Sequence, residues 1–346
     1  MYKISIVVTV WNLEDCINKA LESIEKQTAQ PFEVLIIDDG SVDLSRDLIK
    51  KYTQRNKNWH LYSFEHNGVS HSRNFALSTV RGDYILFLDG DDFYELNLLE
   101  RLEPGLNQNP DIVVFRSYEF DNCSGRSSKS NWTIKTKTDS AQLQSPVLSS
   151  FIGWPWDKLF KVSFLRKYNL TFPILLNSED LVFVYSALFL SKKTLIIDEY
   201  LIRHRINRNT SLSNNLQKSE DAFYAAILML ENFLKKDFLL WKENKQCFQQ
   251  WSIDLTFWAT RNRGVSFNLL KQLYPKINWK LEINSPNFYP NLLFLLRVAE
   301  KTQCQGFLWL LSYNLYKIRK FGLKRARFLF LNFLSKKICN FVKVIT

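Results

Sequence analysis

Three short apolar runs recur in the first part of the chain, each followed by polar residues. They cover residues 4–10, 34–37 and 84–88. The runs are rich in β-branched or aromatic residues and do not alternate with polar positions, which is typical of strands buried on both faces of a parallel sheet. Two later runs, 111–115 and 194–198, predict further strands.

Amphipathic helices are predicted between the first strands. Apolar residues recur at positions i, i+3, i+4 and i+7 over residues 17–24, and nearly so over 44–52. Alternating strands and helices predict an α/β protein with a doubly wound sheet. From about Ser219 the sequence changes to long helical stretches rich in Leu, Phe, Trp and Lys. We therefore expect two regions, 1–215 with the sheet and 216–346 helical.

The composition favours a globular protein of the cytoplasm. The chain has 346 residues, of which 46% are hydrophobic, enough for a substantial core. Its five cysteines are far apart and form no CxxC pair, so the sequence predicts neither a zinc site nor a disulfide framework. No stretch approaches the roughly 18 apolar residues of a membrane span, and the N-terminus is too strand-like for a signal peptide.

The formal net charge of +12 is concentrated at the C-terminal end. Residues 301–346 contain ten Lys or Arg and no Asp or Glu. This asymmetry indicates an anionic partner, either lipid headgroups or nucleic acid. Because the basic residues of 317–327 share one helical arc, we expect this region to dock on the anionic inner face of the plasma membrane. The alternative is a helical bundle with a solvated basic face. No nucleic-acid-binding motif is visible.

Carboxylates follow the predicted second and third strands. Asp38 and Asp39 come after one strand, and Asp89, Asp91 and Asp92 after the other. Ligands of open α/β sheets bind beyond the carboxyl ends of the strands, so we expect these five side chains to converge. Aspartates also cap strand ends, which would explain one such pair, but two clusters at equivalent positions favour a site. Hard oxygen ligands suit Mg²⁺ or Mn²⁺ together with phosphate oxygens. The chain has no GxGxxG or GxxxxGK[ST] loop to cradle phosphates.

Five segments resemble the family 2 glycosyltransferases in order and spacing. They are SIVVTVWN (5–12), VLIIDDGSVD (34–43), NGVSHSRN (67–74), GDYILFLDGDD (82–92) and NSEDLVF (177–183). The resemblance covers roughly residues 1–215. It implies the GT-A fold, a Rossmann-like, mostly parallel sheet flanked by helices. It also implies inverting transfer of a sugar from a nucleotide diphosphate, usually a UDP-sugar, with Mn²⁺ or Mg²⁺ as cofactor.

The resemblance assigns roles to individual residues. Those on the nucleotide side are Thr9, Asn12, Asp39, which would bind the uracil ring, Arg73 and Asp89. Asp91 and Asp92 would hold the metal. In the pair Glu179-Asp180, Asp180 would be the general base that takes the proton of the acceptor hydroxyl. The chain departs from the family at TVWN, where many members have proline-x-tyrosine-asparagine, and at NSED, which lacks a glycine before the acid pair.

A second group of residues is assigned to the acceptor or phosphate side. Trp154 and Trp156 would stack on a sugar face or belong to the core. Lys158 would reach the diphosphate or cap a strand end. His204 and Arg205 lie in a segment that resembles the family's flexible part near the donor phosphates.

Other charged and histidine side chains receive no catalytic role. Arg208 is interpreted as a charge on a solvated loop, and His60 and His66 as surface or packing residues.

The sequence thus predicts a glycosyltransferase that acts on a glycan or lipid-linked glycan in surface polysaccharide synthesis. Two alternatives stay open. One is an inactive scaffold that keeps the GT-A fold, and the other is a basic nucleic-acid-binding protein, which would leave the two aspartate clusters unexplained.

Overall fold

The computed structural model describes residues 2–130, 151, 153–208 and 220–262. The chain divides into two compact units, 1–265 and 266–346, and the described residues all belong to the first. The predicted boundary at 215/216 and the basic stretch 301–346 lie outside the described residues.

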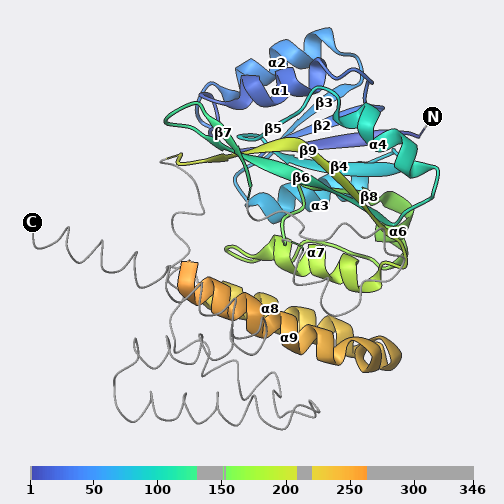
Figure 1. The fold of residues 1–346 in the computed structure, drawn as a ribbon. Coiled ribbons are helices and arrows are strands. Elements are labelled where there is room, and N and C mark those ends of the chain that lie inside the picture. Colours follow the sequence, from blue (N-terminus) through green and yellow to red (C-terminus); the bar gives the residue numbers. More distant parts are fainter. Residues whose placement is uncertain (1, 131–150, 152, 209–219, 263–346) are drawn as a thin grey trace, which may run out of the picture. The chain divides into compact units, whose positions relative to one another are not determined.

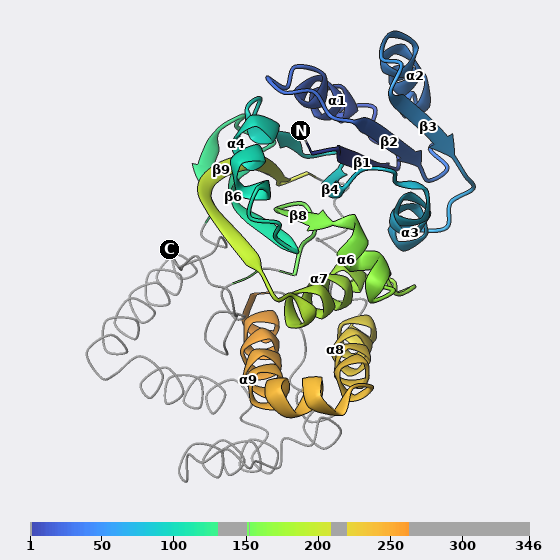
Figure 2. The same cartoon turned by 90° about the vertical axis from the view of Figure 1, so that its right-hand side faces the viewer.

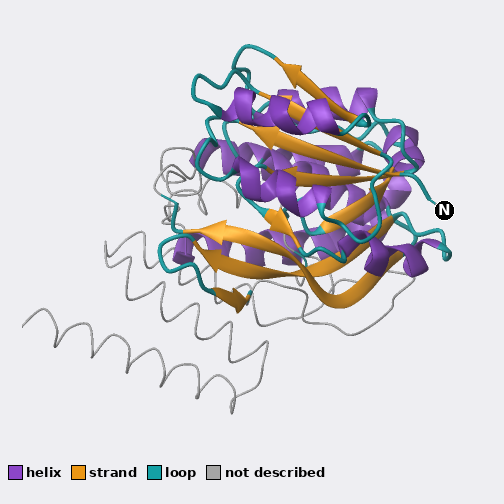
Figure 3. Cartoon of the chain, turned by 90° about the horizontal axis from the view of Figure 1, so that it is seen from above, coloured by secondary structure: helices purple, strands orange, loops and turns teal. Residues whose placement is uncertain are grey.

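The described strands form one mixed sheet of nine strands (Figure 3). They are β1 (Ile4–Val10), β2 (Glu33–Asp38), β3 (Trp59–Ser63), β4 (Tyr84–Asp89), β5 (Phe93–Tyr94), β6 (Ile112–Asp121), β7 (Ser127–Lys129), β8 (Lys158–Lys161) and β9 (Thr194–Ile206). Their order is β3-β2-β1-β4-β8-β6-β9-β5, and β7 pairs with β6. The first four are parallel to one another, whereas β8 is antiparallel to both of its neighbours.

Helices lie on both faces of the sheet. They are α1 (Ile17–Glu25), α2 (Ser45–Arg55), α3 (Val69–Thr79), α4 (Leu98–Leu106), α6 (Val162–Lys167), α7 (Glu179–Leu190), α8 (Glu220–Lys235) and α9 (Phe238–Asn262). Figures 1 and 2 show α1 and α2 on one face and α3, α6 and α7 on the other. The chain is therefore doubly wound about its parallel strands, as the sequence predicted.

Alternate side chains of the strands fill two cores. Ile6 and Val8 of β1 point into a cluster that also contains the apolar faces of α1 and α4. On the other face, the ring centroid of Phe87 lies 5.4 Å from that of Phe172 and 5.9 Å from that of Phe183, and the latter two rings stack at 4.0 Å. Buried aromatic pairs of this kind stabilise a fold by about 0.5 to 1.5 kcal/mol beyond the area they bury. This aromatic cluster fixes α7 against the sheet.

The five strands predicted from the sequence are confirmed. The expectation of a mostly parallel sheet holds for β3, β2, β1 and β4 and for the pair of β6 with β9, whereas β8, β5 and β7 pair antiparallel with their neighbours. β3 was missed because its pattern is half-polar, and of its five residues only Trp59 is buried. β8 was missed because Lys158 and Lys161 bound a strand only four residues long. The antiparallel pairing of β8 then makes the sheet mixed.

The helices predicted after Ser219 are confirmed for the described part, where α8 is followed directly by α9. α8 lies beside α7 (Figure 1), and Trp251 of α9 packs on Tyr185 of α7 at 4.4 Å. Among the described helices, none combines the length and apolar composition that crossing a bilayer requires.

Candidate active site

Three strand ends meet at one edge of the sheet. In the parallel register, Thr9 of β1 stands opposite Asp89 of β4, and Val10 stands opposite Asp38 of β2. The hydroxyl of Thr9 donates a hydrogen bond to Asp89 Oδ1 at 3.2 Å. The polar residues that follow these strands are therefore brought together, although they lie far apart in the sequence.

Arg73 of α3 joins two carboxylates from distant parts of the chain. Its Nη2 donates to Asp89 Oδ1 at 2.7 Å, and its Nη1 donates to Glu179 Oε1 at 2.9 Å. Burial alone would lower the pKa of Arg73, but the charges of Asp89, Glu179 and Asp180 outweigh it and raise the pKa, so the guanidinium stays charged. The bridge holds α3 and α7 together around the end of β4.

Asp180 lies in the first turn of α7, directly after Glu179. The residue before this helix, Ser178, has φ 65°, a left-handed conformation that few residues other than glycine adopt. Burial, followed by the charge of Glu179, raises the pKa of Asp180 to about 8, although Arg73 opposes the shift. A carboxyl group with a pKa near neutrality has the proton affinity that a general base needs.

Asp91 lies in the loop after β4 and faces Arg208. Arg208 Nη2 is 3.2 Å from Asp91 Oδ2. Burial, and then the charges of Asp92 and Asp89, raise the pKa of Asp91 to about 7. The interpretation of Arg208 as a solvated charge is wrong, because its side chain is 19% exposed and pairs with Asp91. Its position three residues beyond Arg205, in the same basic segment, was the signal available in the sequence.

Asp92 is bound by β9 through both of its oxygens. The N–H of Arg205 donates to Oδ1 at 2.7 Å, and His204 Nδ1 lies 3.1 Å from Oδ2. Burial alone would lower the pKa of His204, but Asp92, supported by Asp91 and Asp89, raises it to about 9, so the ring is protonated at neutral pH. Asp92 is 1% exposed, whereas the Asp91 side chain is 22% exposed. Asp92 therefore stabilises the fold, and Asp91 is accessible to a ligand.

His204 also belongs to an aromatic stack. Its ring lies 4.9 Å from that of Trp156 at 15°, and Trp156 lies 5.0 Å from Trp154 at 23°. Trp156 is buried in the core, and Trp154 is half-buried. Of the two alternatives for these tryptophans, Trp156 fits the core, while Trp154 keeps an exposed surface next to the site.

Two further predicted site residues, both with positively charged side chains, are held inside the fold. Lys158 begins β8 fully buried, donates from Nζ to the carbonyl of Trp154 at 2.8 Å, and pairs with the aspartate before it. Arg205 donates from Nε to the carbonyl of Asp91 and from Nη1 to Asn122, both at 2.7 Å. The contacts of Lys158 favour the strand-end alternative. Those of Arg205 position the loop that carries Asp91.

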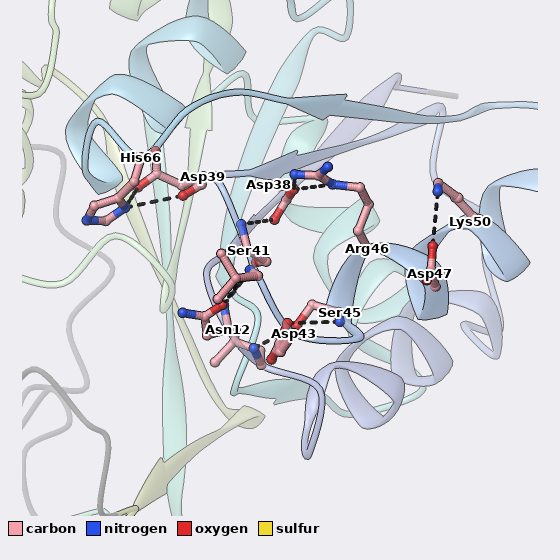
Figure 4. Close-up of polar contacts among 12 residues, drawn as sticks. Asn12, Asp38, Asp39, Ser41, Asp43, Ser45, Arg46, Asp47, Lys50 and His66 are labelled. Carbon is pink, nitrogen blue, oxygen red and sulfur yellow. Dashed lines mark hydrogen bonds and ion pairs between the residues drawn. The ribbon is translucent and has the colours of Figure 1, made fainter.

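Asp39 organises the loop that leads into α3, and Figure 4 shows it in contact with His66. Its Oδ1 accepts the N–H of Asn67 and its Oδ2 the N–H of Gly68, both at 2.9 Å. His66 Nδ1 lies 2.8 Å from Oδ2, and the His66 ring stacks on Trp11 at 4.4 Å and 17°. Trp11 is 40% exposed beside this carboxylate. Sequence reasoning gave Trp11 no role, although an aromatic residue directly after the first strand was a usable signal.

The loops after β1 and β2 are tied to each other (Figure 4). Asn12, with φ 50°, accepts the N–H of Val42 on Oδ1 and donates its own N–H to Ser41 Oγ, both at 2.9 Å. Asp38 is fully buried and pairs with Arg46 at 2.9 Å. Asn12 thus shapes the rim of the site, and Asp38 stabilises the loop behind it.

Part of the chain matches a known protein family. Residues 5–168 match the family described as Glycosyl transferase family 2. This part of the chain is a family 2 glycosyltransferase domain. The chain is 27% identical to the putative glycosyltransferase EpsH of Bacillus subtilis (strain 168), with 66% of each chain covered. It is 30% identical to the poly(ribitol-phosphate) beta-glucosyltransferase of Bacillus spizizenii, over 65% of this chain and 36% of the relative.

A solved structure shows the same fold. The chain resembles S. aureus TarS 1-349 in complex with UDP-GlcNAc, with a TM-score of 0.64 and 22% identity, and the match covers 78% of each chain. The GT-A fold that the sequence resemblance implied is therefore confirmed. At this level of identity the likeness concerns the fold alone.

Proposed function

We propose that the domain transfers a sugar, with inversion, from a UDP-sugar to a hydroxyl of a glycan or lipid-linked glycan in surface polysaccharide synthesis. The observation that carries the proposal is the Arg73 bridge, which ties the donor-side Asp89 to Glu179, next to Asp180. Similar proteins include a poly(ribitol-phosphate) beta-glucosyltransferase and TarS in complex with UDP-GlcNAc, which supports this reaction class.

In this proposal the nucleotide lies along the ends of β1 and β2. The exposed ring of Trp11 offers a flat surface on which a base can stack. Asp39 already accepts two backbone N–H groups, and a carboxylate has about four acceptor positions, so it can also accept the uracil N–H. Thr9 and Asn12 border the pocket, and Arg73 lies toward the diphosphate.

A divalent cation fits the carboxylates after β4. The raised pKa of Asp91 reflects burial first and then the negative charges of Asp92 and Asp89, which Arg208 offsets only in part. We propose that Asp91 holds Mn²⁺ or Mg²⁺ and that Asp89 faces the donor ribose, while Asp92 acts through His204. Within the described residues, no three His, Cys, Asp or Glu side chains form a metal site, so phosphate oxygens would complete the ligand set. The bound cation would stabilise the charge of the leaving diphosphate as a Lewis acid.

Asp180 takes the proton of the acceptor hydroxyl while its oxygen attacks the anomeric carbon opposite the diphosphate. Inversion needs one base and no covalent nucleophile. The contact of Glu179 with Arg73 fixes the first turn of α7, so the base is positioned before the acceptor arrives. Trp154 presents its exposed surface to the acceptor sugar.

A binding panel tests the donor part of the proposal. Melting temperatures are measured with UDP, GDP, dTDP and CMP, with and without Mn²⁺, on the wild type and on Asp91→Asn. A ligand that binds only the folded protein stabilises it by RT ln(1 + [L]/Kd). We expect stabilisation by UDP that requires Mn²⁺ and is lost in the variant. If no nucleotide stabilises a folded sample, the enzyme proposal fails and an inactive scaffold becomes the better interpretation.

The acceptor side is tested separately. The basic stretch 317–346 lies outside the described residues, and its charge supports docking on an anionic membrane that carries a lipid-linked acceptor. Flotation with vesicles of phosphatidylcholine alone or with added phosphatidylglycerol should show binding only to the anionic vesicles. Truncation after residue 316 should abolish this binding. Equal binding to both vesicles, or no effect of truncation, would reject docking through this stretch.

A further inference from the structure

A cavity of about 660 Å³ opens beside β6 and β9, away from the aspartates of the proposed site. Arg203 contacts Glu95 and Tyr118, which line this cavity. The next residue of β9, His204, contacts Asp92 instead. Because successive side chains of a strand point to opposite faces, the cavity and the proposed active site share β9 but lie on its two sides.

The cavity combines aromatic rings with paired charges. Tyr118 of β6 and Tyr200 of β9 lie with their ring centroids 4.8 Å apart and their planes at 33°. Lys129 Nζ lies 4.9 Å from the Tyr200 ring. Ion pairs border the rings: Arg116 with Asp198, Arg203 with Glu95, and Arg101 with Glu199. Since each arginine already has a carboxylate partner, the wall carries little net charge.

Several polar groups in this cavity are available to a ligand. Among the described residues, the hydroxyls of Tyr118 and Tyr200 and the side-chain amide of Asn97 make no hydrogen bond within the protein. The carboxylates of Asp198 and Glu199 retain acceptor positions beyond those used by their arginines. Donors and acceptors therefore surround an aromatic pair, at a size within the roughly 300 to 1,000 Å³ of ligand sites.

The balance of charges decides the class of ligand. A free phosphate or a nucleotide would need unpaired cations, and the only one in the described lining is Lys129. An apolar ligand would displace water from these charged groups without replacing the hydrogen bonds that the water makes. A sugar satisfies both conditions, because its hydroxyls bond to charged and amide groups while its C–H face packs on aromatic rings.

We propose that this cavity is a second glycan-binding site, which takes neutral hexose or N-acetylhexosamine units of a polysaccharide chain. The inference rests on the proposed function in one respect: it takes this polysaccharide to be the acceptor of the transferase. A glycan held on one side of β9 stays tethered close to the transferase site on the other side, which raises its effective concentration there.

Binding of defined oligosaccharides tests the site. Maltohexaose, cellohexaose and chitohexaose are titrated at millimolar concentration into the full chain and followed by saturation-transfer NMR. We expect at least one of them to bind, and the double substitution Tyr118→Ala/Tyr200→Ala to weaken its binding about tenfold or more. Tyr62→Ala is the matched control, since Tyr62 is a half-buried strand tyrosine of β3, at the other end of the sheet.

The outcomes separate this site from the donor site. The inference is wrong if none of the three hexamers binds, or if binding survives the double substitution. If the double variant does not fold, Asn97→Ala, at an exposed position, gives the same test and should weaken binding by a smaller factor. UDP binding is measured on the same samples and should not change. A wild type that binds a hexamer but no nucleotide would contradict the proposed transferase and leave the glycan site standing.

Discussion

Arg73 Nη2 and Asp89 Oδ1 lie 2.7 Å apart in an ion pair whose arginine side chain is 5% exposed. The same guanidinium reaches Glu179 at 2.9 Å. One planar cation therefore spans the carboxylate at the end of β4 and the carboxylate that begins α7. The distance between the proposed donor site and the proposed base therefore depends on these two contacts of the Arg73 guanidinium.

Arg73→Lys should disable the site without a change of charge. Lysine is a compact point charge and cannot donate to both carboxylates in the fork geometry of arginine. We expect kcat/KM for sugar transfer to fall on the order of 100-fold, and the free energy of unfolding, measured in urea, to fall by about 2 kcal/mol. Arg55→Lys is the control, because the Arg55 side chain is 52% exposed in its pair with Glu25, and it should change stability far less than Arg73→Lys. Equal effects of the two substitutions would reject the bridge as an organiser of the site.

The pH dependence of transfer should report Asp180. A general base acts only when deprotonated, and burial next to Glu179 raises its pKa to about 8 in the free protein. We therefore expect kcat/KM to rise with pH up to about 8 and to level off above it. Initial rates of UDP release at saturating Mn²⁺ provide the measurement. A flat profile between about pH 6 and 9 would contradict the assignment of Asp180 as the base.

Asp180→Asn should make the free protein more stable while it removes activity. An acid whose pKa is higher in the folded protein than in the unfolded chain binds more protons when folded. Its ionisation therefore lowers stability as pH rises from the usual 3.8 to about 8. We expect the variant to exceed the wild type in unfolding free energy by on the order of 2 kcal/mol at pH 8, and the difference to vanish toward pH 4.

Urea unfolding over this pH range checks the prediction. Asp47→Asn, at a 67% exposed carboxylate on α2, is the control and should show no comparable pH-dependent gain. A variant of Asp180 that is less stable than the wild type at pH 8 would show that its carboxylate stabilises the fold.

The sequence predicts those parts of the fold that depend on local pattern. Runs buried on both faces, such as 4–10 and 84–88, identify their strands because nearly every position is apolar or β-branched. β8 could not be found this way, since it begins with a charged residue, Lys158, whose buried ammonium group contacts Asp157 and the carbonyl of Trp154. Whether such a charged residue is buried depends on the surrounding fold, which a local pattern does not contain.

The same limit applies to the proposed site. The aspartates after the strands could be located because their position in the topology predicts their place at one edge of the sheet. Asp91 and Asp92 looked equivalent in the sequence, and only the contacts of β9 distinguish them, since His204 and Arg205 bind the second. The stack of Trp11 on His66 depends likewise on a loop whose path the sequence does not specify.

Trp11→Ala should weaken nucleotide binding. If a base stacks on this exposed ring, its loss should raise the Kd for UDP about tenfold, since stacking on an aromatic residue contributes about 1 to 3 kcal/mol per base. The protein itself should lose little stability, because the ring is 40% exposed. Calorimetric titration with UDP and Mn²⁺ measures the effect, and Trp11→Tyr is expected to restore most of the affinity. An unchanged Kd in the alanine variant would exclude Trp11 from the nucleotide pocket.

Asp91→Asn and Asp92→Asn should fail in different ways, although the two residues are adjacent. Asp91→Asn removes a carboxylate whose charge burial disfavours, so the free protein should keep or gain thermal stability but lose the Mn²⁺-dependent response to UDP. Asp92→Asn leaves the protonated His204 without its anionic partner and should lower the unfolding free energy by about 1 to 3 kcal/mol. Melting curves with UDP, in Mn²⁺ or in EDTA, distinguish them, since EDTA should make the wild type behave like Asp91→Asn. If Asp92→Asn proves as stable as the wild type and insensitive to Mn²⁺, the metal-binding role belongs to Asp92 instead.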